Sequence, residues 1–119
     1  MLLVIGGIAS GKRSYVRSLG YDDAQMSSDL AADAPVLLDL EELLRSGPLD
    51  RAARQTLTHK QVICCCEVGQ GVVPIDAGER AWRELVGRIT ADLAAEADQV
   101  VRMVCGIPLT LKQASDEGA

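Results

Sequence analysis

Short apolar runs alternate along the chain with segments in which apolar residues recur at helical spacing. The largely apolar runs are residues 2–5, 36–38, 62–66 and 100–104. Such runs are typical of strands buried on both faces of a parallel sheet. Helical spacing predicts helices over residues 12–19, 41–45, 49–59 and about 77–97. The alternation predicts an α/β fold, with a mostly parallel sheet of about four or five strands flanked by helices.

Two stretches interrupt this pattern. Residues 20–33 are rich in Asp, Ser and Ala and predict a loop with room for one helical turn, which Ser28 or Asp29 could cap. Gly106 and Pro108 are expected to break the last strand. Residues 113–119 have the composition of a disordered tail. We therefore expect one domain over residues 1–112, with a shortened segment around residues 20–35.

The first strand runs directly into a glycine-framed loop that ends in lysine. Gly6 and Gly11 bracket four residues and Lys12 follows, which matches the Walker A pattern of P-loop proteins. In that loop the backbone N–H groups surround an anion, and the lysine reaches the outer phosphates. The alternative is a tight strand-to-helix turn without a ligand. The candidate phosphate-binding residues are Gly6, Gly7, Ile8, Ala9, Ser10, Gly11, Lys12, Arg13 and Ser14.

One residue departs from this pattern. The motif places Ser or Thr after the lysine, because that hydroxyl binds the magnesium ion of the nucleotide. Here the position is Arg13, and Ser14 follows one place later. A helix turns by about 100° per residue, so Ser14 does not present its hydroxyl from the same direction. Phosphate binding is therefore a firmer expectation here than magnesium binding.

Two acidic residues follow predicted strands directly. Asp39 comes after the run at 36–38, and Glu67 comes after the run at 62–66. The carboxyl ends of parallel strands meet at one edge of the sheet, where ligands bind in open α/β folds. We therefore expect Asp39 and Glu67 to lie near Lys12, with Asp39 where a P-loop domain places its second magnesium contact. For Asp39 an alternative stays open, because the same residue could cap the following helix.

Composition narrows the function classes. The 119 residues carry a formal net charge of −5, which argues against a broad basic surface for nucleic acid, although Arg80, Arg83 and Arg88 form a local basic cluster. The apolar run at the N-terminus is too short for a membrane span or a signal peptide, so we expect a cytoplasmic protein without a membrane partner. The cysteines at 64–66 and Cys105 lack zinc-site spacing and are expected to be reduced core residues.

An ordered set of motifs resembles the signature of a known family. Residues 67–74 read Glu-Val-Gly-Gln-Gly-Val-Val-Pro, and residues 80–88 contain Arg-Ala-Trp-Arg-Glu followed by Gly-Arg. Residues 105–112 read Cys-Gly-Ile-Pro-Leu-Thr-Leu-Lys, and residues 6–12 read Gly-Gly-Ile-Ala-Ser-Gly-Lys. Together they resemble the bifunctional adenosylcobinamide kinase / adenosylcobinamide-phosphate guanylyltransferase family of cobalamin biosynthesis.

The resemblance implies a P-loop, RecA-like fold that binds ATP or GTP together with Mg²⁺. The implied reaction is phosphoryl transfer from the nucleotide to the aminopropanol hydroxyl of adenosylcobinamide. Lys12 would hold the β- and γ-phosphates, and Asp39 or Glu67 would hold the magnesium ion. Catalysis would then consist mostly of positioning and charge neutralisation.

The resemblance adds three substrate-binding candidates on the predicted helix at 77–97. Arg80, Trp82 and Arg83 match a family motif and are expected to contact a cobinamide-type substrate or a second subunit. Family members form homo-oligomers, so a homo-oligomer is expected here as well. The alternative is that Trp82 belongs to the core and the two arginines lie on a solvated helix face.

Departures from the family pattern bear on the activity. The family's P-loop serine is Arg13 here, and its asparagine before Glu67 is Cys66. The family also carries a longer segment before Pro35, with the histidine that takes up GMP. This chain has one histidine, His59, which we expect at a helix end and facing solvent. We therefore expect a kinase-like phosphotransferase without guanylyltransferase activity, and the alternative is a noncatalytic nucleotide- or partner-binding accessory protein.

Overall fold

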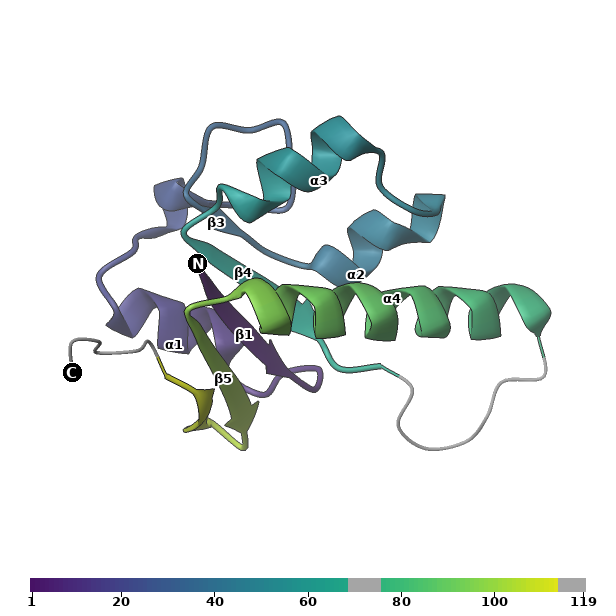
Figure 1. The fold of residues 1–119 in the computed structure, drawn as a ribbon. Coiled ribbons are helices and arrows are strands. Elements are labelled where there is room, and N and C mark those ends of the chain that lie inside the picture. The colour runs from purple at the N-terminus through teal and green to yellow at the C-terminus, as the bar shows by residue number, and fades with distance from the viewer. Residues whose placement is uncertain (69–75, 114–119) are drawn as a thin grey trace.

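The computed structural model describes residues 1–68 and 76–113 and contains a sheet of six strands flanked by helices (Figure 1). The strand order is β2-β3-β4-β1-β5-β6, and every strand except β6 pairs in parallel. The strands are β1 (Leu2–Gly6), β2 (Met26–Ser27), β3 (Val36–Leu37), β4 (Val62–Cys66), β5 (Gln99–Val104) and β6 (Ile107–Lys112). The helices are α1 (Lys12–Ser18), η1 (Asp23–Gln25), α2 (Leu40–Leu43), η2 (Leu44–Ser46), α3 (Arg51–Thr58) and α4 (Ala77–Glu96).

Strand β1 lies in the middle of the sheet. It pairs with β4 on one side and β5 on the other, so that Leu3 stands between Ile63 and Val100. A central parallel strand is covered on both faces, which explains why its side chains are apolar without alternation. Its last residue, Gly6, is therefore fixed between two neighbouring strands where the loop begins.

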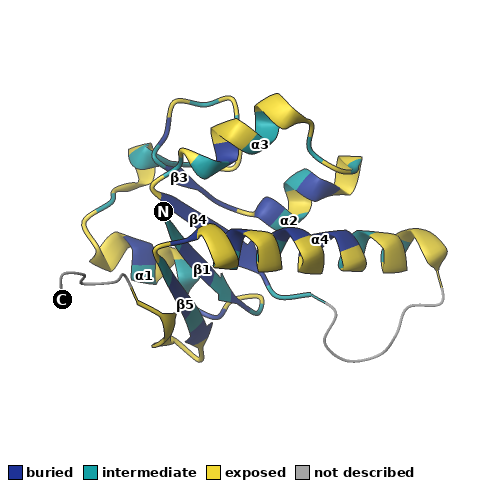
Figure 2. Cartoon of the chain, viewed as in Figure 1, coloured by how far each residue is buried: buried dark blue, intermediate teal, exposed yellow. Residues whose placement is uncertain are grey.

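The helices cover the two faces of the sheet unequally. Figure 2 shows α4 with an exposed outer side, lying over strands whose residues are mostly buried. The core on this face, which α2, η2 and α3 also join, contains Leu3, Leu37, Leu40, Leu44, Leu57, Ile63, Cys65, Leu85, Val86, Ile89, Leu93, Ala97 and Val100. The smaller core on the other face lies under α1 and contains Val4, Val16, Val36, Leu38, Val62, Cys64, Val101 and Met103.

The consecutive cysteines of β4 are buried and unpaired, as predicted. Cys65 belongs to the core under α4 and Cys64 to the core under α1, because successive strand residues point to opposite faces. Burial raises the pKa of both thiols to about 12. In residues 1–68 and 76–113, no three His, Cys, Asp or Glu side chains are placed to hold a metal ion. Cys64 and Cys65 therefore act as small apolar core residues.

The predicted α/β class and the four predicted strands are confirmed, but the sheet has six strands rather than four or five. One unpredicted strand is β2, which has only two residues and no apolar run that would reveal it. This segment contains two turns. The predicted one follows Asp29, whose Oδ1 accepts the Ala31 N–H at 3.0 Å and whose carbonyl accepts the Ala32 N–H at 3.1 Å. The other is η1, which the side chain of Asp22 caps and which the sequence did not predict.

The other unpredicted strand is β6. Gly106 and Pro108 do not end the sheet, because Cys105 and Gly106 form a tight turn after which the chain returns antiparallel to β5. Pro108 is tolerated because β6 is an edge strand, where a missing N–H costs no ladder hydrogen bond.

Some predictions fall where the structure gives no description. Residues 69–75, which carry much of the family signature, and residues 114–119, which make up most of the predicted tail, lie outside the described residues. Among the helices of the described part, none is long and apolar enough to cross a membrane.

Candidate functional site

The loop between β1 and α1 has a geometry that two of its glycines make possible. A Cβ atom on Gly6 would lie 2.4 Å from Ser10 Oγ and 2.9 Å from the Met103 carbonyl oxygen, so no larger residue fits there without movement. Gly11 has φ +99°, and a Cβ atom on it would lie 3.2 Å from Gly106 Cα. The loop is therefore packed tightly against the turn between β5 and β6.

Lys12 folds over this loop. Its Nζ donates to the carbonyl oxygens of Gly6 at 3.2 Å and Gly7 at 2.8 Å. The loop is closed further by a hydrogen bond from Ser10 N–H to the Gly7 carbonyl at 3.2 Å. An ammonium group has three donors, so Lys12 keeps donor capacity for an anion at the loop.

A cavity of about 480 Å³ opens beside the loop, at the carboxyl edge of the sheet. It is lined by Ala9, Ser10, Gly11, Lys12, Arg13, Ser14, Leu38, Asp39 and Cys64. Six of the nine predicted phosphate-binding residues therefore share one cavity with the predicted acidic residue Asp39. Ile8 instead projects into solvent, with 90% of its surface exposed.

Asp39 occupies the N-cap position, directly before the first residue of α2, but its side chain does not cap the helix. Its backbone has φ 57°, and its side chain accepts no hydrogen bond from the helix N–H groups. One carboxylate oxygen instead accepts a hydrogen bond from Ser28 Oγ at 2.8 Å. The interpretation of Asp39 as a helix cap is therefore correct only for its position in the chain. The other interpretation fits better, because Asp39 lines the cavity beside Lys12.

The lining carries two cations and one carboxylate, those of Lys12, Arg13 and Asp39. Arg13 is exposed, and its guanidinium makes no hydrogen bond or ion pair with any residue in the described part of the chain. Its charge nevertheless reaches the cavity wall. Burial raises the pKa of the Cys64 thiol, while Lys12 and Arg13 both act in the opposite direction.

Glu67 does not join this cavity. Its carboxylate pairs with the Arg102 guanidinium, with Nε–O distances of 3.0 and 3.1 Å. The side chain lines a separate cavity of about 280 Å³ on the α4 face, together with Leu3 and Thr90. Only the backbone of Glu67 touches the loop, by donating its N–H to the Gly6 carbonyl at 2.8 Å. The structure thus brings Lys12 and Asp39 together and leaves Glu67 on the other face.

These residues do not fit a magnesium ion held by the protein. Mg²⁺ takes oxygen ligands, and P-loop proteins supply them from the hydroxyl after the lysine and from acidic residues nearby. Here Arg13 occupies the place of the hydroxyl, and Asp39 is the one carboxylate among the residues that line the cavity. Of the two candidate metal ligands, Asp39 lines this cavity, whereas the carboxylate of Glu67 is engaged by Arg102.

The three substrate candidates on α4 do not line the Lys12 cavity either. Trp82 Nε1 donates to the Glu41 carbonyl at 2.8 Å, and the Arg45 guanidinium stacks 3.3 Å from the centre of the indole ring. Trp82 therefore packs at the edge of the α4 core, as the alternative interpretation has it. Arg80 is exposed in the first turns of α4, and Arg83 is half-buried.

Two residues contribute to the site without a signal in the sequence. Ser28 holds Asp39, but it follows a strand too short to recognise. Glu41 stabilises the end of β4, because its Oε1 accepts a hydrogen bond from the Cys66 N–H at 2.8 Å. An acidic residue in the first turn of a helix normally indicates only a favourable charge at that helix end.

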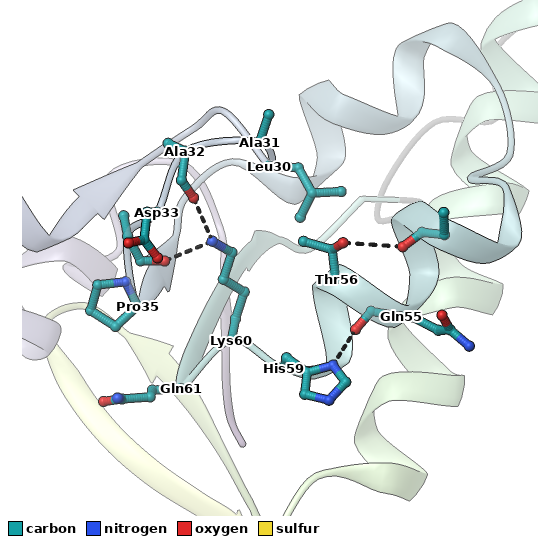
Figure 3. A pocket seen from close by; sticks show the side chains of 12 residues that line it. Leu30, Ala31, Ala32, Asp33, Pro35, Gln55, Thr56, His59, Lys60 and Gln61 are labelled. Atoms are coloured by element: carbon teal, nitrogen blue, oxygen red, sulfur yellow. Dashed lines mark hydrogen bonds between the residues drawn. The ribbon is translucent and has the colours of Figure 1, made fainter.

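A larger cavity, of about 960 Å³, lies at the opposite edge of the sheet (Figure 3). There Lys60 Nζ donates to the carbonyl oxygens of Ala32 at 2.9 Å and Ala34 at 2.7 Å. His59 ends α3, is exposed, and contacts the Gln55 carbonyl through Nδ1 at 2.7 Å, which confirms its predicted helix-end position. Lys60 thus ties the loop before β3 to the end of α3.

The chain is similar to known proteins of cobalamin biosynthesis. The model of the family described as cobinamide kinase / cobinamide phosphate guanyltransferase matches residues 37–111. The bifunctional adenosylcobalamin biosynthesis protein CobU of Salmonella typhimurium is 41% identical over 61 residues, which cover 51% of this chain and 34% of that protein. Its counterpart in Escherichia coli is 39% identical over 61 residues, with the same coverage. The match thus spans about a third of each relative, and the loop at 6–12 precedes the residues that the family model matches.

Proposed function

This chain belongs to the cobinamide kinase / cobinamide phosphate guanyltransferase family, and from that premise we propose that it binds the phosphates of ATP or GTP at the loop from Gly6 to Lys12. The observation that carries the proposal is the shared cavity of Lys12, Arg13 and Asp39 at the carboxyl edge of the sheet. Ligands of open α/β folds bind at this edge. The left-handed backbone of Ala9, with φ 57°, and the close packing at Gly11 support a loop that does more than connect a strand to a helix.

The reaction we propose is phosphoryl transfer from the nucleotide to the hydroxyl of a cobinamide-type substrate. Lys12 holds the outer phosphates, since its ammonium already lies over the loop with donor capacity left. Asp39, oriented by Ser28, is placed to accept a proton or to position the substrate hydroxyl at the same cavity. Guanylyl transfer is not part of the proposal, because His59 lies at the other edge of the sheet.

Two measurements test this function. Isothermal titration with ATP and with GTP measures binding, and mass spectrometry detects phosphorylated cobinamide after incubation with either nucleotide. We expect micromolar to millimolar binding, a phosphorylated product, and the loss of both in Lys12→Ala. No binding of either nucleotide at millimolar concentration would contradict the proposal.

A noncatalytic nucleotide-binding accessory protein is the second candidate. It is favoured by the placement of Glu67, whose carboxylate is engaged by Arg102 instead of standing at the cavity. The same two measurements separate the candidates, because an accessory protein would bind nucleotide without forming phosphorylated cobinamide. A covalent GMP adduct after incubation with GTP would contradict both.

We further propose that the chain forms a homo-oligomer. We also propose that it works in a reducing compartment such as the cytoplasm. Strand β6 is an edge strand, and its side chains Ile107, Leu109 and Leu111 are 61%, 46% and 58% exposed. Apolar edges of this kind favour contact with another chain. Four unpaired cysteines support the reducing compartment. Light scattering should give a mass above that of one chain, and Leu109→Lys should reduce it.

A further inference from the structure

We propose that the loop binds its phosphates without a magnesium ion held by the protein, and that the Arg13 guanidinium supplies the positive charge that the metal would otherwise bring. This inference rests on the proposed function, because it concerns the same cavity. It follows because the residues that line the cavity do not supply the oxygen ligands that a magnesium site requires.

The place of Arg13 in the chain gives the first argument. It directly follows Lys12, where the motif has the hydroxyl that binds magnesium, and it lines the cavity. Ser14 also lines the cavity, but it lies one residue further along α1 and so projects about 100° away. The substitution therefore exchanges a metal ligand for a fixed cation at the phosphate site.

The second argument comes from the interactions that the Arg13 guanidinium does and does not make. Four other arginines, Arg17, Arg45, Arg54 and Arg102, each pair with a carboxylate, as Arg17 does with Asp23 at 2.8 Å. Arg13 has no hydrogen bond or ion pair within residues 1–68 and 76–113. Its five N–H donors are therefore available, and their planar arrangement matches two phosphate oxygens at once.

The charge balance gives the third argument. A magnesium ion here would meet the Lys12 and Arg13 cations, while Asp39 alone offers a carboxylate and already accepts a hydrogen bond from Ser28. A doubly charged phosphoryl group instead meets two cations and one anion, which is favourable without any metal. Phosphate therefore suits this cavity better than the metal does.

Binding measured with and without magnesium tests the inference. The probes are inorganic pyrophosphate, ATP and GTP, titrated into the full chain in EDTA and then in excess MgCl₂. For the unaltered chain we expect affinities in the two buffers that agree within about threefold. Arg13→Ser, which restores the hydroxyl of the motif, should bind about tenfold more weakly in EDTA and regain affinity when magnesium is added.

Two further variants serve as controls. Arg13→Lys keeps the charge but not the planar fork, and we expect it to bind in EDTA with an affinity between those of the unaltered chain and Arg13→Ser. Arg51→Ser removes one exposed arginine from α3, away from the cavity, and should leave binding unchanged. Circular dichroism should show the same fold for all, because Arg13 and Arg51 are exposed.

The outcomes separate this inference from the function on which it rests. Binding by the unaltered chain that requires magnesium, or an Arg13→Ser variant with unchanged affinity in EDTA, would overturn the inference and leave phosphate binding standing. No binding of any probe in either buffer would overturn both.

Discussion

Lys12 and Lys60 lie at opposite edges of the sheet, and each donates hydrogen bonds to two backbone carbonyl oxygens. The carbonyls that Lys12 contacts belong to its own loop, at Gly6 and Gly7. Those that Lys60 contacts belong to Ala32 and Ala34, about 26 to 28 residues away in sequence. The first lysine therefore leaves long-range structure untouched, whereas the second ties two distant segments together.

The residues next to the two lysines also differ in whether they already have an interaction partner. Beside Lys12 stands Arg13, which has no hydrogen bond or ion pair within the described residues. Beside Lys60 stands His59, whose ring contacts the Gln55 carbonyl (Figure 3). In the larger cavity the Lys60 ammonium thus already serves the fold, while in the smaller cavity Lys12 and Arg13 keep donors for a ligand. Cavity size alone would point to the edge at Lys60, and not to the edge at Lys12 where we propose that phosphate binds.

Replacing each lysine by alanine should give the largest difference between the two cavities, and this difference should appear in phosphate binding. Lys12→Ala should weaken binding of ATP, GTP or pyrophosphate by about 100-fold, because charged hydrogen bonds to phosphate are lost. Lys60→Ala should leave this binding unchanged. Isothermal titration of both variants checks the contrast. Equal losses in the two variants would show that the edges of the sheet do not differ as described.

The glycines of the loop give the next largest effect, this time on stability. Gly6→Ala should lower the free energy of unfolding by about 3 kcal/mol, because its Cβ atom would meet Ser10 Oγ and the Met103 carbonyl. Gly7→Ala is the matched control, since nothing lies within 4 Å of its Cβ position, and it should cost less than about 0.5 kcal/mol. Urea unfolding followed by circular dichroism measures both. A tolerated Gly6→Ala would contradict the packing of the loop against β5.

Lys60 should reveal its structural role in the same unfolding measurement. Lys60→Ala removes both hydrogen bonds that hold the loop before β3 and should cost about 1 to 2 kcal/mol. Lys12→Ala should change the free energy of unfolding by less than about 0.5 kcal/mol, because both carbonyl oxygens keep a backbone donor, the Glu67 N–H at 2.8 Å for Gly6 and the Ser10 N–H at 3.2 Å for Gly7. A larger loss of stability in Lys12→Ala than in Lys60→Ala would reverse the assignment of the two lysines.

The pH dependence of stability gives the smallest effect and probes the wall of the Lys12 cavity. Burial raises the pKa of Cys64 to about 12 from an ordinary value of 9.0, so the folded chain holds this proton more tightly than the unfolded chain. The resulting stability is fully present below pH 9 and is lost as the pH rises from 9 towards 12. At pH 10 the loss should be about 1 kcal/mol for this thiol.

Cys64→Ala should remove the part of this decline that Cys64 causes, while Cys65 and Cys66, whose pKa values burial also raises, still contribute theirs. Urea unfolding at pH 7, 9 and 10 checks the trend. Identical slopes in the variant and the unaltered chain would show that Cys64 is not buried as a neutral thiol.

The sequence predicts the parts of the fold that depend on local pattern. The runs that form β1, β3, β4 and β5 are apolar because those strands are buried, and the loop at β1 is marked by glycines and Lys12. The meeting of Lys12 with Asp39 also follows from the sequence, because the carboxyl ends of parallel strands share one edge.

Other features depend on neighbours that the sequence does not reveal. Glu67 follows β4 as expected, but β5 places Arg102 beside it and engages its carboxylate. The two-residue strand β2 exists only because β3 offers it a partner, and with it comes the contact between Ser28 and Asp39. Strand β6 depends on a turn at Cys105 and Gly106 that returns the chain along β5. From the sequence, Gly106 indicated only that the preceding strand ends there.

The central place of β1 has a consequence for the order in which the molecule is assembled. Leu2 pairs with Val62 and with Gln99, partners that lie far along the chain, and Gly6 and Gly11 are shaped by contacts to Met103 and Gly106. Contacts of such high sequence separation form slowly, because a long loop must close first. The loop from Gly6 to Lys12 is synthesised before β5 and β6, but it should gain its final shape only once these strands have joined the sheet.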